Sequence, residues 1–312
     1  MSIRVISLLP GATEMVAALG AGDLLVGRSH ECDFPLEVQA LPVCTQARLQ
    51  SQKPSGAIDA DVKALLRAAL NIYDLQLDTM RELQPTHIVT QDQCDVCAVS
   101  VATVEQALAE LLASDIRPQV VSCKGETLAG VWDDMARVGR ALGLDPDPAL
   151  AALQARVENC TQKVNGAIAA GKPRPRVAAI EWPEPLMGAG NWIPELVARA
   201  GGMPLFAQPG KHSPYIDWEQ LVAAAPEAIV VMPCGFDLER TRLEARALTQ
   251  HPAWAELPAV KAGRAFIVDG NAYFNRPGPR LVESLEILAE ILHPETCQFG
   301  WRDRAWDILR AN

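Results

Sequence analysis

Four of the eight cysteines follow short apolar segments, where loops are expected to begin; they are Cys32, Cys94, Cys97 and Cys234. A thiolate binds soft metal ions, and the spacing Cys94-x-x-Cys97 can hold zinc or carry redox chemistry. Three interpretations remain open: structural thiols, thiols that contact a metal or a ligand, and a redox pair. The redox interpretation fits least well, because the pair does not open a helix in a thioredoxin-like unit.

Aromatic residues make up only 5% of the chain, yet several fall in or beside the same loops. These are Phe34, Trp182, Trp192, Phe236, Tyr273 and Phe274. Aromatic side chains gathered on loops are typical of a site for a large, flat, partly apolar ligand. Any one of them could instead anchor its loop to the core, but the group as a whole favours the ligand site.

Polar side chains in these loops could orient such a ligand, and the candidates are His30, Gln91 and Arg276. A loop histidine can also be a metal or axial ligand, although an ordinary hydrogen-bonding role is commoner. Glu181 and Glu184 could act as an acid–base pair or simply solvate their loop. The sequence contains no phosphate-binding loop, dinucleotide fingerprint, nucleophile elbow or zinc-protease helix.

These loops need a scaffold that brings distant parts of the chain together. Short apolar runs alternate with segments of helical periodicity along the sequence. The expected strands are 4–9, 24–27, 87–90, 119–122, 176–180, 228–232 and 265–268, and the expected helices are 12–19, 75–83, 101–113, 128–142, 192–200, 218–224, 238–248 and 281–292. This alternation predicts an α/β fold with parallel sheets covered by helices on both faces.

The two halves of the chain repeat the same order of elements around one long helix. Apolar residues at steps of three and four between Leu150 and Ile168 predict that helix. We therefore expect two Rossmann-like lobes, residues 1–145 and 172–312, joined by a backbone helix within residues 146–171. Ligands of open parallel sheets bind beyond the carboxyl ends of the strands, so a cleft lined by strand-end loops should lie between the lobes.

The composition narrows the possible partners and locations. Lys and Arg number 28 against 38 Asp and Glu, and the net charge of −10 disfavours nucleic-acid binding, which relies on cations. No apolar run reaches the ~18 residues that cross a bilayer, so we expect no membrane insertion. Pro10 and Glu14 interrupt the apolar stretch 5–21, unlike a signal peptide. We expect a cytoplasmic location for the chain as given, or a periplasmic one if a leader has been removed.

A series of motifs runs along almost the whole chain. The motifs are Ile6-Ser7-Leu8-Leu9-Pro10-x-x-Thr13-Glu14, Leu83-x-Pro85-x-x-Ile88-Val89, Thr90-Gln91-x-x-Cys94, Gly190-Asn191-Trp192-Ile193-Pro194-Glu195, Gly201-Gly202, Trp218-Glu219-x-Leu221, Pro226-x-x-Ile229-Val230 and Arg276-Pro277-Gly278-Pro279-Arg280. Their order resembles the ABC-transporter substrate-binding proteins for cobalamin and iron-siderophores, most closely the cobalamin-binding members. The resemblance implies the helical-backbone (class III) periplasmic-binding-protein-like fold.

The resemblance also implies non-catalytic capture of a cobalamin-like corrinoid between the lobes, with no required cofactor. It implies docking on an ABC transporter permease through one acidic residue on each lobe, at the positions of Asp78 and Glu219. We expect the site to be largely preformed, because a rigid backbone helix permits little closure. The expected ligand contacts are His30, Phe34, Gln91, Trp182, Trp192, Phe236, Tyr273 and Arg276. Two other functions remain open: an iron-siderophore, haem or thiolate metal-binding protein, and an enzyme that processes a corrinoid or metal chelate.

Overall fold

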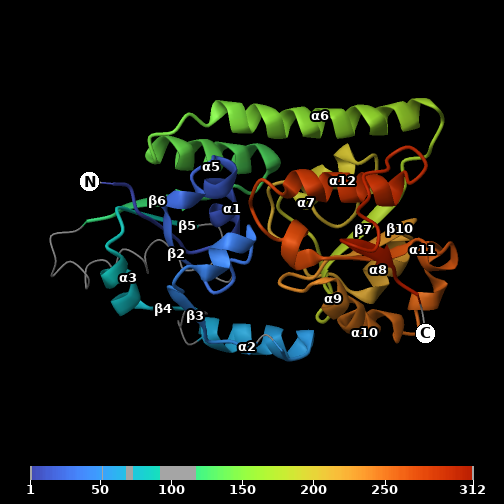
Figure 1. Cartoon of the computed structure of the whole chain (residues 1–312). Helices are drawn as coiled ribbons and strands as arrows, with labels where there is room; N and C mark the ends of the chain where they lie inside the picture. Colours follow the sequence, from blue (N-terminus) through green and yellow to red (C-terminus); the bar gives the residue numbers. More distant parts are fainter. Residues whose placement is uncertain (1, 51, 68–72, 92–116, 311–312) are drawn as a thin grey trace.

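The computed structural model describes residues 2–50, 52–67, 73–91 and 117–310. The chain forms one large sheet in each half of the sequence, and helices cover both sheets (Figure 1). This arrangement confirms the predicted α/β class. In the ranges just given, no helix is both long enough and apolar enough to cross a membrane.

The first sheet has the strand order β2-β1-β5-β6, and all neighbouring strands are parallel. Its strands are β1 (Val5–Ser7), β2 (Leu25–Arg28), β5 (His87–Gln91) and β6 (Gln119–Cys123); the helices of this half are α1 (Pro10–Ala18), α2 (Ser55–Arg67), α3 (Leu77–Leu83) and α5 (Leu128–Ala141). Helix α1 begins at Pro10, whose fixed φ suits a first turn. The chain leaves α1 through Gly20 at φ +75°, a conformation that glycine adopts without strain.

The second sheet has the order β12-β11-β10-β7-β8, and β9 also pairs with β7. Its strands are β7 (Arg176–Trp182), β8 (Met187–Gly188), β9 (Met203–Pro204), β10 (Ala228–Val231), β11 (Ala265–Val268) and β12 (Trp306–Ile308); its helices are α7 (Ile193–Arg199), α8 (Trp218–Ala224), α9 (Leu238–Glu244), α10 (Arg246–Thr249), α11 (Pro258–Lys261) and α12 (Leu281–Leu292). The central strands β7, β10 and β11 are parallel, as predicted, while β8 and β12 join antiparallel. All four residues of β10 are buried, because helices cover both faces of the sheet.

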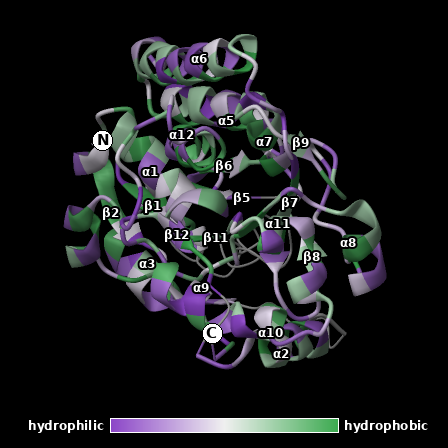
Figure 2. Ribbon diagram, turned by 90° about the vertical axis from the view of Figure 1, so that its right-hand side faces the viewer, coloured by the Kyte–Doolittle hydropathy of each residue, from purple (hydrophilic) through white to green (hydrophobic). Residues whose placement is uncertain are grey.

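One long helix, α6 (Asp147–Ala169), runs along one side of the molecule and passes over both halves (Figure 1). At 1.5 Å per residue its 23 residues span about 35 Å. Val157, Cys160, Val164 and Ala167 form its buried stripe, and α12 lies against it as a mostly apolar helix (Figure 2). The helix therefore acts as the expected backbone element. The lobe boundaries at 145/146 and 171/172 stay a prediction.

The structure differs from the sequence-based expectations in several local elements. Helix α2 and the small antiparallel sheet of β3 (Thr45–Ala47) and β4 (Tyr73–Leu75) were not expected. The predicted helix 238–248 is two helices, α9 and α10, that meet at Ala245, and the predicted helix 75–83 begins at Leu77 because Leu75 ends β4. The predicted helix 101–113 lies outside the described residues. Short 3-10 turns cover Gly22–Leu24, Leu36–Ala40 and Trp254–Glu256, and a π-helical turn covers Gly270–Phe274.

Candidate ligand-binding seam between the lobes

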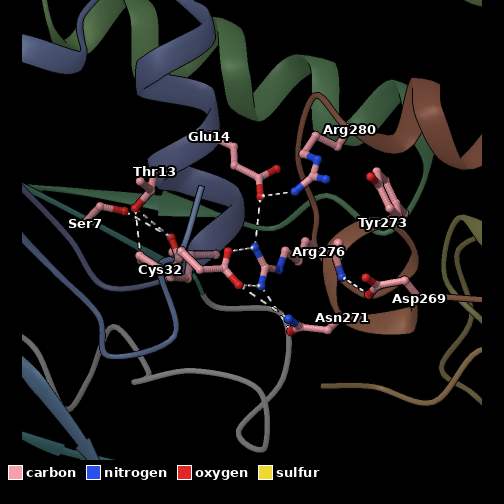
Figure 3. Close-up of polar contacts among 12 residues, drawn as sticks. Ser7, Thr13, Glu14, Cys32, Asp269, Asn271, Tyr273, Arg276 and Arg280 are labelled. Atoms are coloured by element: carbon pink, nitrogen blue, oxygen red, sulfur yellow. Dashed lines mark hydrogen bonds and ion pairs between the residues drawn. The ribbon is translucent and has the colours of Figure 1, made fainter. Parts of the chain in front are cut away.

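Loops at the carboxyl ends of the strands of the two sheets meet along a line that we call the seam. From the first half come the loop after β2, which carries Asp33, and helix α1, which carries Glu14. From the second half comes the loop after β11, which carries Arg276 and Arg280. Figure 3 shows Glu14 pointing toward Arg276 and Arg280 across the seam. Parallel sheets therefore bring together residues that lie far apart in the sequence, as the strand-end rule requires.

Arg276 is the centre of a buried ion-pair cluster. One guanidinium nitrogen lies 2.5 Å from Asp33 Oδ1 and 3.1 Å from Glu14 Oε1, and the other donates to Asp33 Oδ2 at 2.9 Å and to Asn271 Oδ1 at 3.0 Å. The side chains of Arg276 and Glu14 are only 6% and 1% exposed. Such two-pronged pairing satisfies the geometry of the guanidinium and offsets the cost of burying the charge.

Burial and pairing have opposite effects on the two carboxyl groups. Burial raises the pKa of Glu14 from 4.5 to about 7, although the charges of Arg276 and Arg280 act against it. Burial also acts to raise the pKa of Asp33, but the hydrogen bonds and charge of Arg276 outweigh burial and leave that pKa below its usual value. Within the described residues, Glu14 Oε2 has no hydrogen-bond partner. Glu14 is therefore the member of the cluster that gains a proton near neutral pH.

Backbone and aromatic contacts surround the ion pairs. A Cβ atom placed on Gly11 would lie 2.2 Å from the carbonyl oxygen of Pro277, so the two halves approach too closely there for any side chain. The guanidinium of Arg280 lies 4.4 Å from the ring centres of both Phe34 and Tyr273, one from each half. We call Gly11, Glu14 and Asp33 with Arg276 and Pro277 the inner contact.

A second set of contacts crosses the seam at the start of α2. The Trp182 indole donates to the carbonyl oxygen of Ser55 at 3.2 Å, and the backbone N–H of Ser55 donates to Glu244 Oε2 at 2.9 Å. Arg240 donates to the carbonyl oxygens of Gln52 and Lys53. We call residues 52–63 the strap.

The expectation that the cleft between the lobes is preformed stays a prediction. Two surface hollows of about 220 and 290 Å³ are lined by residues of one half each, around Glu290 and around Arg48. The second hollow includes Lys53 and Asp61 of the strap, and both volumes fall below the ~300–1,000 Å³ of ordinary ligand sites. Among the described residues, the inner contact and the strap contacts both cross the seam.

The predicted aromatic contacts fall into two groups. Trp182 is half-buried and lies 5.2 Å from the Phe236 ring, while Tyr273 and Phe34 flank Arg280. Trp192 and Phe236 are only 4% exposed and Phe274 is fully buried, so these three have little surface to offer a ligand in this structure. Trp192 donates its indole N–H to the carbonyl oxygen of Phe274 at 2.9 Å, which is the core-anchoring role.

The predicted polar contacts are also placed at or beside the seam. The two His30 ring nitrogens differ: Nδ1 lies 2.6 Å from Thr45 Oγ1, and Nε2 lies 4.0 Å from Glu31. Burial lowers the pKa of His30, so its neutral form dominates at pH 7. Gln91 ends β5 and is 4% exposed. The ligand-binding roles of these residues stay predictions.

The cysteines do not form a metal centre in the part of the chain that the structure describes. Cys32 is buried, accepts a hydrogen bond from Thr13 at 3.0 Å, and has a pKa raised by burial to about 11. A neutral thiol of this kind is a poor metal ligand. Cys234 is half-buried, and Cys94 and Cys97 lie outside the described residues. Across those described, no three His, Cys, Asp or Glu side chains gather as metal ligands would.

The two candidate docking residues and the two loop glutamates lie in different surroundings. Asp78 has a 93% exposed side chain on α3, and Glu219 is exposed on α8, so both are accessible on the surface. Glu181 accepts a hydrogen bond from Ser213 at 2.6 Å, and Glu184 lies against Gly56 of the strap.

Sequence reasoning did not single out Glu14, Asp33, Arg240, Glu244 or Arg280 as seam residues. A signal was available for Glu14, since a lone carboxyl among the buried residues of α1 requires a partner. The partners of the others depend on contacts between distant segments.

Known proteins resemble this chain over most of its length. The family model described as periplasmic binding protein matches residues 5–272. An uncharacterised ABC transporter substrate-binding lipoprotein of Bacillus subtilis is 23% identical over 94% of this chain and 81% of its own. The vitamin B12-binding protein of Vibrio vulnificus is 24% identical over 92% of this chain and 89% of its own.

Solved structures resemble the fold over nearly its full length. A periplasmic haem-binding protein from Pseudomonas aeruginosa has a TM-score of 0.69 and 20% identity, and the match covers 95% of this chain and 94% of the other. The periplasmic vitamin B12-binding protein of Vibrio cholerae has a TM-score of 0.63 and 19% identity, covering 93% and 96%. At these identities the likeness establishes the two-lobed fold.

Proposed function

Because this chain belongs to the periplasmic binding protein family, we propose that it binds a cobalamin-like corrinoid between its lobes and passes it to an ABC transporter permease. At the coarser level it is the substrate-binding component of such a transport system, for a ligand of the vitamin B12, haem or iron-chelate type. The similarity to a vitamin B12-binding protein over 92% of the chain carries the corrinoid proposal.

The chemistry of the seam supports a wide, flat ligand. Trp182 in the second half, which packs on the buried Phe236 ring, and Phe34 and Tyr273 around Arg280 place aromatic side chains at the strand ends of both halves. Aromatic faces bury a large area of a macrocycle at a low cost in conformational entropy. Capture needs no reacting group, so the proposed role is binding without turnover.

A spectral titration with cyanocobalamin and with cobinamide tests this proposal. We expect saturable binding at micromolar concentration or below, and we expect Trp182→Ala to weaken it about tenfold, a loss of ~1.4 kcal/mol of contact energy. Trp218→Ala is the matched control. Trp218 lies in α8, away from the seam, and its ring stacks on His251. If neither corrinoid binds the parent protein at micromolar concentration, the corrinoid proposal is wrong.

Haem is the second candidate ligand, since a haem-binding protein shares the fold with a TM-score of 0.69. The same titration with haemin distinguishes the two, because saturation by haemin without saturation by either corrinoid assigns the site to haem. Metal analysis of protein purified under reducing conditions tests the thiolate alternative, which requires stoichiometric zinc or iron. Turnover of a bound corrinoid with a reductant would support the enzyme alternative.

Delivery of the ligand requires a surface that a permease can recognise. Asp78 and Glu219 are exposed on helices of different halves, as the resemblance to transporter-docking proteins implies. The relatives include a lipoprotein, and the solved structures are periplasmic proteins. We therefore propose that this chain also works outside the cytoplasmic membrane.

A further inference from the structure

The two sets of contacts across the seam differ in burial. The inner contact joins Arg276 and Glu14, whose side chains are 6% and 1% exposed, to Asp33, whose side chain is 46% exposed, and it includes a backbone approach that leaves no room for a Cβ atom. In the strap contacts, Arg240 and Glu244 have side chains that are 21% and 13% exposed. Separating the inner contact breaks four hydrogen bonds of the Arg276 guanidinium at once, three of them to carboxyl groups. The partly exposed strap groups can instead exchange their partners for water one at a time.

The strap lies over the part of the second half that carries the best-placed aromatic residues. Ser55 accepts the indole N–H of Trp182, and Trp182 in turn packs on Phe236. Arg240 lies 4.8 Å above the Phe236 ring while it holds the strap carbonyls. The strap therefore covers the ends of β7 and β10, where a ligand of this sheet belongs.

A second group of contacts holds the strap further along α2. Tyr215 donates to Asp59 at 3.3 Å, and Lys63 lies 4.8 Å from the ring centre of Tyr215. Tyr215 itself is 56% exposed. These contacts are individually weak because water competes for each of them.

The base of the strap is anchored to the first half, where the backbone of Arg28, at the end of β2, bonds to Pro42 and Cys44 just before β3. The strands that precede and follow it, β3 and β4, pair with each other in antiparallel register, Ala47 opposite Tyr73. Arg48 and Asp74 add an ion pair beside this pairing. Figures 1 and 2 show α2 at the edge of the molecule opposite α6. The strap can therefore move about its base while the backbone helix and the inner contact stay in place.

We propose that residues 52–63 are a displaceable cover over Trp182 and Phe236, which withdraws to admit the ligand while the inner contact holds the two halves together. This inference rests on the proposed function for the identity of the ligand. In this proposal the ligand enters when one helix, α2, moves at the outer edge of the seam.

Distance measurement between spin labels tests the cover directly, without requiring a ligand. One label pair, Ala60→Cys with Glu239→Cys, joins exposed positions of the strap and α9. The control pair, Arg81→Cys with Glu256→Cys, joins exposed positions of the two halves away from the strap. Both pairs are placed in a background with Cys94, Cys97 and Cys234 replaced by serine, because the other cysteines are buried.

We expect two distance populations for the strap pair and one for the control pair. Glu244→Ala removes the acceptor of Ser55 and should shift the strap pair toward the longer distance, whereas Glu256→Ala, introduced with the strap pair only, should not. Saturation with cyanocobalamin or haemin should also favour the longer distance. A single strap distance that neither Glu244→Ala nor ligand changes overturns the cover.

The same samples separate failure of the cover from failure of the proposed function. Two strap distances in protein that binds none of the probe ligands leave the cover in place and remove the ligand assignment. Ligand binding with one unchanging strap distance removes the cover and leaves the assignment. Two distances in the control pair would show that the halves themselves separate, and this also overturns the inference.

Discussion

Glu14 lies on the part of α1 where every residue from Gly11 to Val16 is buried. A carboxyl in such a position is retained only with a cation beside it, and the chain supplies Arg276 and Arg280 from the opposite half. One of its oxygens nevertheless finds no partner among the residues that the structure describes. The protonation state of this single group therefore affects how the two halves fit together.

The pH dependence of stability should reveal Glu14. Its folded-state pKa of about 7 lies above the ordinary 4.5, so its contribution to stability is complete below pH 4.5 and is lost as the pH rises through about 7. Glu14→Gln cannot titrate. We therefore expect the melting temperature of the parent, relative to Glu14→Gln, to be higher at pH 5 than at pH 8, as measured by scanning calorimetry.

Glu256→Gln is the control for that comparison, because Glu256 pairs with Lys261 on the surface and its hydrogen bond to that lysine holds its pKa below the usual value. Its replacement should not reproduce the trend between pH 5 and pH 8. Parallel curves for the parent and Glu14→Gln would show that the carboxyl does not titrate in this range.

Glu290 on α12 shows how one helix organises a segment without regular structure. Its carboxylate accepts hydrogen bonds from the backbone N–H groups of Phe299, Gly300, Trp301 and Arg302, and from the Trp306 indole. Burial acts to raise the pKa of Glu290, but these donors outweigh it and leave the pKa below its usual value. The helix thereby holds the chain that leads into β12.

Replacing Glu290 should destabilise the second half. Glu290→Ala leaves the buried Trp306 indole N–H and four partly buried backbone N–H groups without their acceptor, and a buried group left unpaired costs ~1–3 kcal/mol. We expect the free energy of unfolding in urea to fall by at least ~2 kcal/mol, whereas Glu295→Ala, which removes a surface pair with Lys172, should change it by less than ~1 kcal/mol. Equal effects of the two variants would contradict the anchoring role.

The parallel strands and the long helix could be predicted from sequence because their signals are local. The run Ala228–Val231 is apolar throughout because both faces of β10 are covered, and the stripe of α6 repeats every three or four residues. Helix α2 also carries Ile58, Val62 and Leu65 at helical spacing. Its position over the second half depends on Glu244, 189 residues from Ser55, and no local pattern encodes such a pairing.

The candidate site, too, could be predicted only where its signals are local in the sequence. Aromatic and polar residues could be assigned to strand-end loops, because the rule for parallel sheets places those loops together. Whether each side chain faces the seam or the core could not be read from sequence, and Trp192 and Phe274 proved to be core residues. The contacts that Arg276 and the strap make across the seam depend on packing between the halves.

At the scale of the whole molecule, α6 and the inner contact connect the two halves at separate places. We expect small-angle X-ray scattering to give a radius of gyration that changes by less than ~1 Å when a ligand saturates the protein, as in other preorganised binding sites. Arg276→Met removes the inner ion pairs and should leave a larger radius of gyration in the ligand-free protein. A large contraction of the parent protein on binding would instead indicate closure of the lobes.

Glu14 and Arg276 lie 262 residues apart in the chain, so they are synthesised at different times. At about 5–20 residues per second, a ribosome reaches Arg276 roughly 13 to 50 s after it has made Glu14. During that interval the nascent first half carries an acidic face whose counter-charge has not yet been translated. Water and solution ions must solvate that face until Arg276 has been synthesised. The two halves can therefore pack together only near the end of synthesis.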